Sequence, residues 1–489
     1  MRISPEVGLE RAPPNSLIVA SRIFHEMSQF PNPGLSGERA SFPCNSHSLI
    51  EWSLRPRWRG ALFLIPILVG SVWLAAEAVR VAQVTYQIDT LSIPDLQKAL
   101  RQDPGNPNLV HRLGIVYSYN PTDINLPEAV KYLRQAVELN PRRWDFWSDL
   151  GTTCDFVGDT ACSDEAFERA RALNLMSPAL QWALGNHYLL TTRPDKAFPY
   201  FRRLLDLDPQ YLGATFRLCL RATQDPQAIY TEVVPQGRDA SARFAFLMYL
   251  SSSADYESAM RIWGQMISGP DRSPDLSMVK PFLDFLLDHD QIQDAGTVWN
   301  DLQHAGVIPP EPHLQTANLL YDGSFEGPLL NTGFAWRIND SPDLVFDFSE
   351  PSAHKGVKCL RIDFAVGRNA DYDLLSQVVR IKPNTQYQLT AYVRSDNLTS
   401  DSGPRLRVVE MGCGNCVART SDATVGTTPW HPIDVGFMTQ AQTQAVRISF
   451  WRPQNQPYPR DITGTVWLDD VTLHTVDAPG PDVNRARAR

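Results

Sequence analysis

The sequence predicts a multidomain chain of the α plus β class, in which an α-helical solenoid is followed by a β-sandwich, with one N-terminal transmembrane helix. Three observations predict this order: an apolar stretch around residue 70, a helical pattern that recurs after it, and apolar–polar alternation after Pro309-Pro310. With 489 residues, 43% of them hydrophobic, the chain can bury more than one core.

The charge balance argues against a nucleic-acid partner. Lys and Arg number 45 against 54 Asp and Glu, a net charge of −9, so a general polyanion-binding surface is not expected.

A transmembrane helix is predicted at residues 60–80. Gly60 to Val79 carries one charge, Glu77, and about 20 helical residues span the roughly 30 Å of a bilayer core. Arg55, Arg57 and Arg59 precede the stretch, so the positive-inside rule places the N-terminus in the cytoplasm.

This orientation predicts a single-pass protein of a bacterial inner membrane. Residues 1–56, rich in Pro and Ser without a sustained period, would be a disordered cytoplasmic tail, and the bulk of the chain would be periplasmic or extracellular. Two alternatives remain open. Ala76-Glu77-Ala78 has the small-x-small pattern of a signal-peptide cleavage site, and the stretch could also be a buried core helix.

The cysteines take their interpretation from this location. In an oxidising compartment, close pairs are expected to be disulfides, here Cys154 with Cys162 and Cys413 with Cys416. For the second pair, free thiols and a redox or metal site stay as alternatives.

Residues 90–305 show an internal repeat. Gly114, Gly151 and Gly185 recur after 37 and then 34 residues, and the same pattern of small and aromatic residues surrounds each glycine. The residues predicted to pack one helix on the next are Gly114, Tyr117, Ala129, Gly151, Ala166, Gly185, Tyr188, Ala197 and Phe201.

These motifs resemble the tetratricopeptide repeat. The resemblance implies stacked helix pairs and a groove that binds protein partners, with no catalytic machinery. Arg142-Arg143 and Arg202-Arg203 could hold an acidic segment in this groove or simply face solvent.

Residues 317–476 alternate between apolar and polar in short strands, which predicts a β-sandwich. Asn318 to Glu326, Gly333 to Trp336, Tyr387 to Arg394 and Val466 to Leu473 resemble carbohydrate-binding modules with a galactose-binding-like jelly roll. Residues 477–489 would be a disordered tail.

The resemblance implies two sites in the jelly roll. The one cofactor implied is a structural Ca²⁺, and its oxygen ligands would be Asp322, Glu326 and Asp470. Carboxylates that simply cap turns are the alternative for these positions. A sugar platform could be built from aromatic and polar side chains, and the candidates are Trp336, Tyr372, Trp451, Arg452 and Tyr458.

No catalytic constellation stands out, so the sequence predicts a non-enzymatic protein. We expect a membrane-anchored extracytoplasmic scaffold that binds proteins through its repeats and a glycan or protein through its jelly roll, in envelope polysaccharide assembly or export. The alternative is a glycan-binding surface protein in which the repeats are a spacer.

Overall fold

A computed structural model describes residues 65–79, 92–237, 239–269, 274–310, 318–412 and 418–476. The chain divides into two units, Met1–Ala82 and Gln83–Arg489. In the first unit, residues 65–79 are helical. Within the described ranges, no helix is long and apolar enough to cross a membrane, so the transmembrane helix predicted at 60–80 is not supported. The predicted tails, 1–56 and 477–489, lie outside the described residues.

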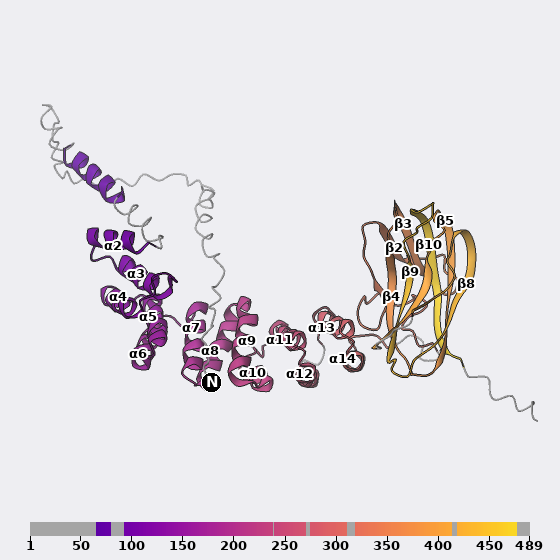
Figure 1. Cartoon of the computed structure of the whole chain (residues 1–489), viewed down its shortest axis with the longest axis horizontal. Coiled ribbons are helices and arrows are strands. Elements are labelled where there is room, and N and C mark those ends of the chain that lie inside the picture. Colours follow the sequence, from indigo (N-terminus) through magenta and orange to yellow (C-terminus); the bar gives the residue numbers. More distant parts are fainter. Residues whose placement is uncertain are drawn as a thin grey trace, which may run out of the picture. The chain divides into compact units, whose positions relative to one another are not determined.

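The second unit begins with stacked helices (Figure 1). The helices are α2 (Ile93–Gln102), α3 (Pro107–Tyr119), α4 (Leu126–Leu139), α5 (Trp144–Val157), α6 (Thr160–Leu173), α7 (Pro178–Leu190), α8 (Pro194–Leu207), η1 (Pro209–Tyr211), α9 (Leu212–Thr223), α10 (Pro226–Glu232), α11 (Ser241–Ser252), α12 (Tyr256–Ser268), α13 (Leu276–Asp288) and α14 (Ile292–His304).

Local sequence signals set where these helices begin. Asn106 caps α3, since its side chain accepts hydrogen bonds from the backbone N–H groups of residues 108 and 109, and Pro107 follows in the first turn. Ser177 caps α7 in the same way, again before a proline. The repeats that begin with α3 and α7 therefore each carry a local signal for the start of their first helix.

The recurring spacing of the glycines has a steric cause. A Cβ atom at Gly114 would lie 2.5 Å from Leu133 Cγ, and one at Gly185 would lie 2.5 Å from Phe201 Cζ. At Gly151 it would lie 2.9 Å from the ring of Phe167. In each of these repeats, a bulky side chain of the second helix packs directly against a glycine of the first. The two helices therefore lie closer together than they could if the glycine were a larger residue.

The remaining predicted packing residues lie where the repeat requires them. Ala129, Ala166 and Ala197 are buried. Tyr117 stacks on Tyr132 and Tyr188 on Tyr200, with ring centroids 5.8 and 5.5 Å apart. The pattern is least regular between α8 and α11, where a 3-10 turn and a helix of only 7 residues replace full-length helices.

The strands form two antiparallel five-stranded sheets in the described residues (Figure 1). Sheet A has the order β1-β4-β9-β6-β7 and sheet B the order β2-β3-β10-β5-β8. The strands are β1 (Arg337–Ile338), β2 (Leu344–Glu350), β3 (Cys359–Arg368), β4 (Tyr372–Arg380), β5 (Gln386–Leu398), β6 (Arg405–Met411), β7 (Ala418–Thr420), β8 (Gly426–Met438), β9 (Ala445–Arg452) and β10 (Ile462–Thr475).

One core fills the space between the two sheets. Along β5, Tyr387, Leu389, Ala391 and Val393 are buried while the residues between them are partly exposed. This period of two is what places one set of side chains inside and the other on an outward face. Each sheet therefore offers an outward face on which polar side chains can gather.

The last helices and the sandwich share apolar contacts. Trp299 of α14 makes edge-to-face contacts with Tyr321 and Phe334, at centroid distances of 5.5 and 5.8 Å. Asp284 of α13 accepts hydrogen bonds from Thr332 Oγ1 and from the N–H of Gly333, both at 2.9 Å. The sandwich thus covers the apolar end that the last repeat would otherwise expose to water.

Candidate functional site

The outward face of sheet A carries a cluster of polar side chains around one indole. Leu406, Ile448 and Phe450 belong to the core, so the residues that alternate with them on β6 and β9 face outward. The register sets Trp451 of β9 opposite Asp373 of β4 on one side and opposite Arg405 of β6 on the other.

Trp451 is held in place by two charged neighbours. Its Nε1–H donates to Asp371 Oδ1 at 2.6 Å, and the guanidinium carbon of Arg407 lies 4.5 Å from the ring centroid. Arg407 Nη2 also donates to Asp373 Oδ2 at 3.0 Å. The indole is therefore fixed but remains partly exposed, the arrangement that suits a platform for a flat apolar ligand face.

Three polar atoms of this cluster have no hydrogen-bond partner among the described residues: Asp373 Oδ1, Arg407 Nε and Ser449 Oγ. They come from three adjacent strands, because Arg407 pairs with Ser449 in the ladder and β4 lies on the other side of β9. Buried polar groups are normally satisfied, so a concentration of unsatisfied ones marks a place where a polar ligand or water completes the set. Hydroxyl groups both donate and accept, and suit this mixed set.

Arg452, which the sequence predicts as a sugar contact, is wholly buried, so the prediction is wrong. Its guanidinium donates to the backbone oxygens of Ser402, Ala370 and Arg460, at 3.0, 2.6 and 2.7 Å. Burial disfavours its charge and lowers the pKa of Arg452. The side chain instead ties together three loops beside Trp451, including the loop that carries Asp371.

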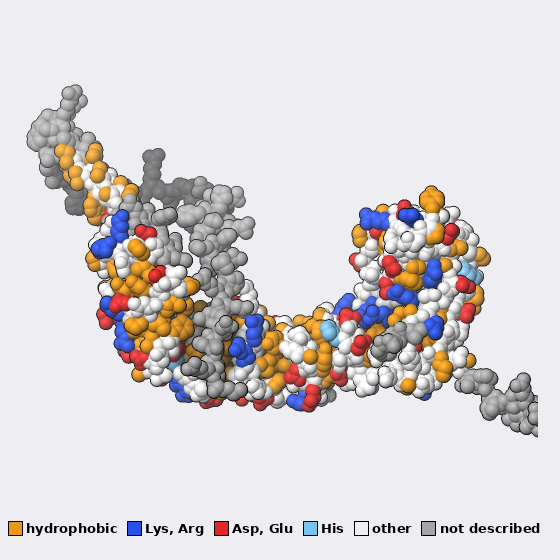
Figure 2. Space-filling view, viewed as in Figure 1, with side chains coloured by type: hydrophobic (Ala, Val, Ile, Leu, Met, Phe, Trp, Pro, Cys, Tyr) orange, Lys and Arg blue, Asp and Glu red, His pale blue; other side chains and the backbone are white. Residues whose placement is uncertain are grey.

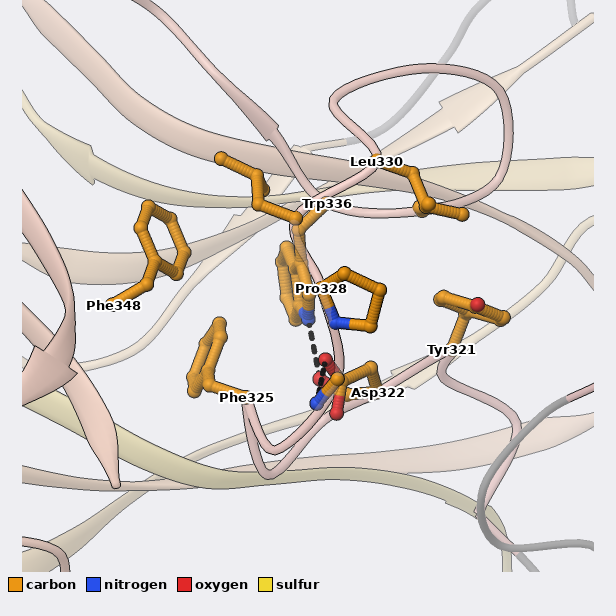
Figure 3. Close-up of a pocket in the computed structure, with 10 residues that line it drawn as sticks. Tyr321, Asp322, Phe325, Pro328, Leu330, Trp336 and Phe348 are labelled. Carbon is orange, nitrogen blue, oxygen red and sulfur yellow. Dashed lines mark hydrogen bonds between the residues drawn. The ribbon is translucent and has the colours of Figure 1, made fainter. Parts of the chain in front are cut away.

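Two of the predicted aromatic contacts are also buried. Trp336 is 3% exposed and donates from Nε1 to the backbone oxygen of Asp322 at 3.0 Å, beside Phe325 (Figure 3). The cavity next to it measures about 10 Å³, which is far too small for a sugar ring. Tyr372 is buried as well, and its hydroxyl donates to Asp343 Oδ2 at 3.0 Å. Neither ring offers a face for stacking, so both predictions are wrong.

Tyr458 has the opposite environment, since 90% of its surface is exposed. It lies in the loop after β9, and Asn455 of this loop donates to the backbone oxygen of Pro459 at 2.9 Å. Of the five predicted sugar contacts, Trp451 and Tyr458 are therefore the two that the structure leaves accessible.

The three predicted calcium ligands make other contacts. Asp322 accepts hydrogen bonds from the N–H groups of Glu326 and Gly327, and Glu326 Oε1 accepts from the N–H of Val357. Asp470 Oδ2 lies 2.6 Å from Nδ1 of His354. In the ranges that the structure covers, no three acidic, histidine or cysteine side chains gather as metal ligands would, so the carboxylates fit the turn-capping alternative.

The solenoid contains a disulfide and a buried ionic cluster close to it. Cys154 and Cys162 join α5 to α6, whereas Cys413 and Cys416 lie outside the described residues. His187 of α7 is 1% exposed, and its Nδ1 and Nε2 lie 2.9 Å from Asp155 and Asp164. Arg193 Nη2 donates to Asp164 at 3.1 Å. Burial disfavours the imidazolium, but the two carboxylates outweigh it and raise the pKa of His187.

One arginine of each pair considered for the groove has a partner within the solenoid. Arg143 forms an ion pair with Asp145, and Arg202 donates to the backbone oxygen of Thr231. These contacts favour the solvent-facing alternative.

Sequence reasoning missed Asp371, Asp373, Arg407 and Ser449. A signal was present, since Asp373 and Arg407 interrupt otherwise apolar strands at positions that alternate with core residues. The pattern shows that they face outward but not which strands are neighbours in sheet A, so the cluster itself could not be assembled.

Comparisons with known proteins find similar proteins for both parts of the chain. A tetratricopeptide repeat family model matches residues 158–211. A crystal structure of MamA protein is similar at 21% sequence identity and a TM-score of 0.27, and the match covers 36% of this chain and 96% of the MamA chain. The chain spans 65% of a MamA D159K mutant structure, at 23% identity over 24% of this chain and a TM-score of 0.21.

For the sandwich, the structure of TmCBM61 in complex with beta-1,4-galactotriose is 16% identical, covering 33% of this chain and all of its own at a TM-score of 0.23. No curated protein sequence matches the chain.

Proposed function

We propose that the chain is a non-enzymatic scaffold that binds a glycan on the outward face of sheet A and protein partners through its helical repeats. The observation that carries the glycan assignment is the cluster around Trp451, where an accessible indole lies beside three unsatisfied polar atoms on three adjacent strands. A pyranose stacks its apolar face on such a ring and offers hydroxyl groups to the neighbouring donors and acceptors.

The ligand on this face would be an uncharged sugar. Arg407 is already paired with Asp373 and Asp371 accepts from the indole, so each of these three charged groups has a partner before any ligand arrives. An added charge would have to compete with these pairs, whereas hydroxyl groups complete the empty hydrogen-bonding positions.

The repeats supply a surface for protein. Stacked helix pairs expose a continuous series of side chains that can follow an extended segment or a helix of a partner. Figure 2 shows acidic and basic side chains interspersed on the visible face, so the net charge of −9 is not gathered there into one field that would select a polycation.

The location that we propose is outside the cytoplasm, with residues 60–80 as the anchor in a bacterial inner membrane and a role in envelope polysaccharide assembly or export. The Cys154–Cys162 disulfide supports an oxidising compartment. A reporter fused after Arg489 that is active only outside the cytoplasm is the expected result. A reporter active only inside would contradict the proposed orientation.

Affinity electrophoresis of the full chain through gels that contain neutral polysaccharides tests the glycan assignment. At least one neutral polysaccharide should retard the chain, and Trp451→Ala should weaken this binding about tenfold or more, because the stacking surface is lost. Trp144→Ala is the matched control, since this partly exposed tryptophan belongs to helix α5 of the solenoid and to neither sheet. Retardation that Trp451→Ala leaves unchanged, or none on any polysaccharide, would leave only the protein-binding part of the proposal.

A further inference from the structure

The outward face of sheet B carries a second group of aromatic side chains. Val466 and Leu468 of β10 belong to the core, so Trp467 between them faces outward, and Tyr392 of β5 does the same. His354 stacks on Tyr392 with ring centroids 3.8 Å apart and lies 5.8 Å from the ring of Trp430. Three aromatic residues from β5, β8 and β10 thus lie on one face, opposite the Trp451 cluster.

Two cations lie over these rings. The guanidinium carbon of Arg394 is 4.1 Å from the ring centroid of Trp467, and Lys355 Nζ is 5.9 Å from that of Tyr392. The ladder places Val393 opposite His431 and Ser395 opposite Thr428, so Arg394 lies beside Trp430. Across the described ranges, neither Arg394 nor Lys355 forms a hydrogen bond or an ion pair through its side chain.

The acidic side chains of the same sheet, by contrast, are occupied. Asp363 pairs with Arg361 at 3.0 Å and accepts from Thr465, and Asp470 contacts His354. Asp434 accepts from Gln388 Nε2 at 2.8 Å. Asp469 accepts from the backbone N–H groups of His354 and Lys355, at 2.8 and 3.1 Å, and Asp396 accepts from Thr427 Oγ1 at 3.4 Å. The charged side chains of this face that make neither a hydrogen bond nor an ion pair among the described residues are therefore Arg394 and Lys355, and both lie over aromatic rings.

The indole N–H of Trp467 also lacks a partner, although 92% of the side chain is buried under its neighbours, with 8% exposed. Arg394 covers the ring, and a buried donor without an acceptor costs free energy. An acceptor group that drew Arg394 aside would reach both the indole N–H of Trp467 and the guanidinium of Arg394. The unmet requirement on this face is thus for an anionic acceptor beside a surface that can stack.

We propose that the outward face of sheet B binds an acidic glycan, in which a sugar ring stacks on Trp430 and a uronate carboxylate pairs with Arg394 and Lys355. This second site goes beyond the proposed function, because it uses the opposite sheet and a charged ligand. Arg presents a planar fork that matches a carboxylate, and a pyranose provides the flat partner for the indole. A neutral sugar would leave both cations without a counter-charge.

Titration calorimetry of the full chain with galacturonate, glucuronate and mannuronate oligomers tests the proposal, each oligomer being paired with its methyl ester. The ester keeps the ring and removes the charge, so at least one acid should bind about tenfold or more tightly than its ester. Added salt should weaken this binding. Equal affinity for acid and ester, or no binding of any acid, would overturn the proposal.

Variants locate the site. Arg394→Gln and Lys355→Gln should each weaken binding of the acid several-fold to tenfold. Lys355 is exposed, so Lys355→Gln should leave the fold intact even if Arg394→Gln disturbs it. Arg361→Gln is the matched control, since this arginine of the same sheet is already paired with Asp363. Affinity that both glutamine variants leave unchanged would contradict the site. Trp451→Ala should leave acid binding intact, which separates this proposal from the one for sheet A.

Discussion

Gly185→Ala tests whether close helix packing explains the recurring glycines. The new Cβ would lie 2.5, 2.6 and 2.8 Å from three ring carbons of Phe201, and Phe201 is fully buried, so the ring cannot simply turn into solvent. Forcing a methyl group into a packed core costs about 1–3 kcal/mol. Replacing glycine by alanine within a helix returns about 1 kcal/mol, so we expect a net loss of up to about 2 kcal/mol.

Gly264→Ala is the matched control, because this glycine is also helical and an added Cβ would meet nothing within 4 Å. There the helix propensity acts alone and should stabilise the chain by about 0.5–1 kcal/mol. Urea denaturation followed by far-UV circular dichroism compares the two, and Phe201→Leu in the Gly185→Ala background should recover part of the loss. If Gly185→Ala stabilises the chain as Gly264→Ala does, the packing explanation is refuted.

Two further predictions concern buried charges. Because the pKa of His187 is raised in the fold, its contribution to stability is present below its ordinary pKa of about 6.5 and is lost as the pH rises through the folded value. The free energy of unfolding, measured by urea titration, should therefore fall from pH 6 to pH 8 more steeply in the wild type than in His187→Gln. Equal pH dependence in the two proteins would contradict the role of Asp155 and Asp164. Arg452→Met should lower the free energy of unfolding by about 3 kcal/mol, because the acceptors in three loops lose a charged donor; a change in the thermal midpoint within experimental error would show that the loops hold without it.

The helical part was predictable because each repeat carries its own complete signal. Gly114, Gly151 and Gly185 are forced by local contacts inside one helix pair, and such contacts recur with the sequence period. The transmembrane helix was predicted from the hydropathy and length of one stretch and from the arginines before it, and the part of 60–80 that the structure covers contains no helix that meets the length and apolarity required.

The sugar face was predictable only in part because alternation does not report strand order. Trp451 and Tyr372 looked equivalent as aromatic residues in alternating strands, yet one is partly exposed and the other buried. Arg452 looked like a surface residue because it is charged, but three loops that meet only in the fold enclose it. The contacts that build the cluster, such as Arg407 with Asp373, join residues 34 positions apart through the ladders of sheet A.

The central claim is that the unsatisfied polar atoms beside Trp451 bind a neutral glycan. Titration calorimetry of the full chain with the oligosaccharide that binds best tests it most directly through Ser449→Ala, which removes one of those atoms without touching the indole. The claim predicts that Ser449→Ala weakens binding about five- to tenfold while stability stays the same or rises, because an unsatisfied buried hydroxyl has been removed. Unchanged affinity in Ser449→Ala, with stability lowered instead, would show that the hydroxyl serves the fold and would contradict the claim.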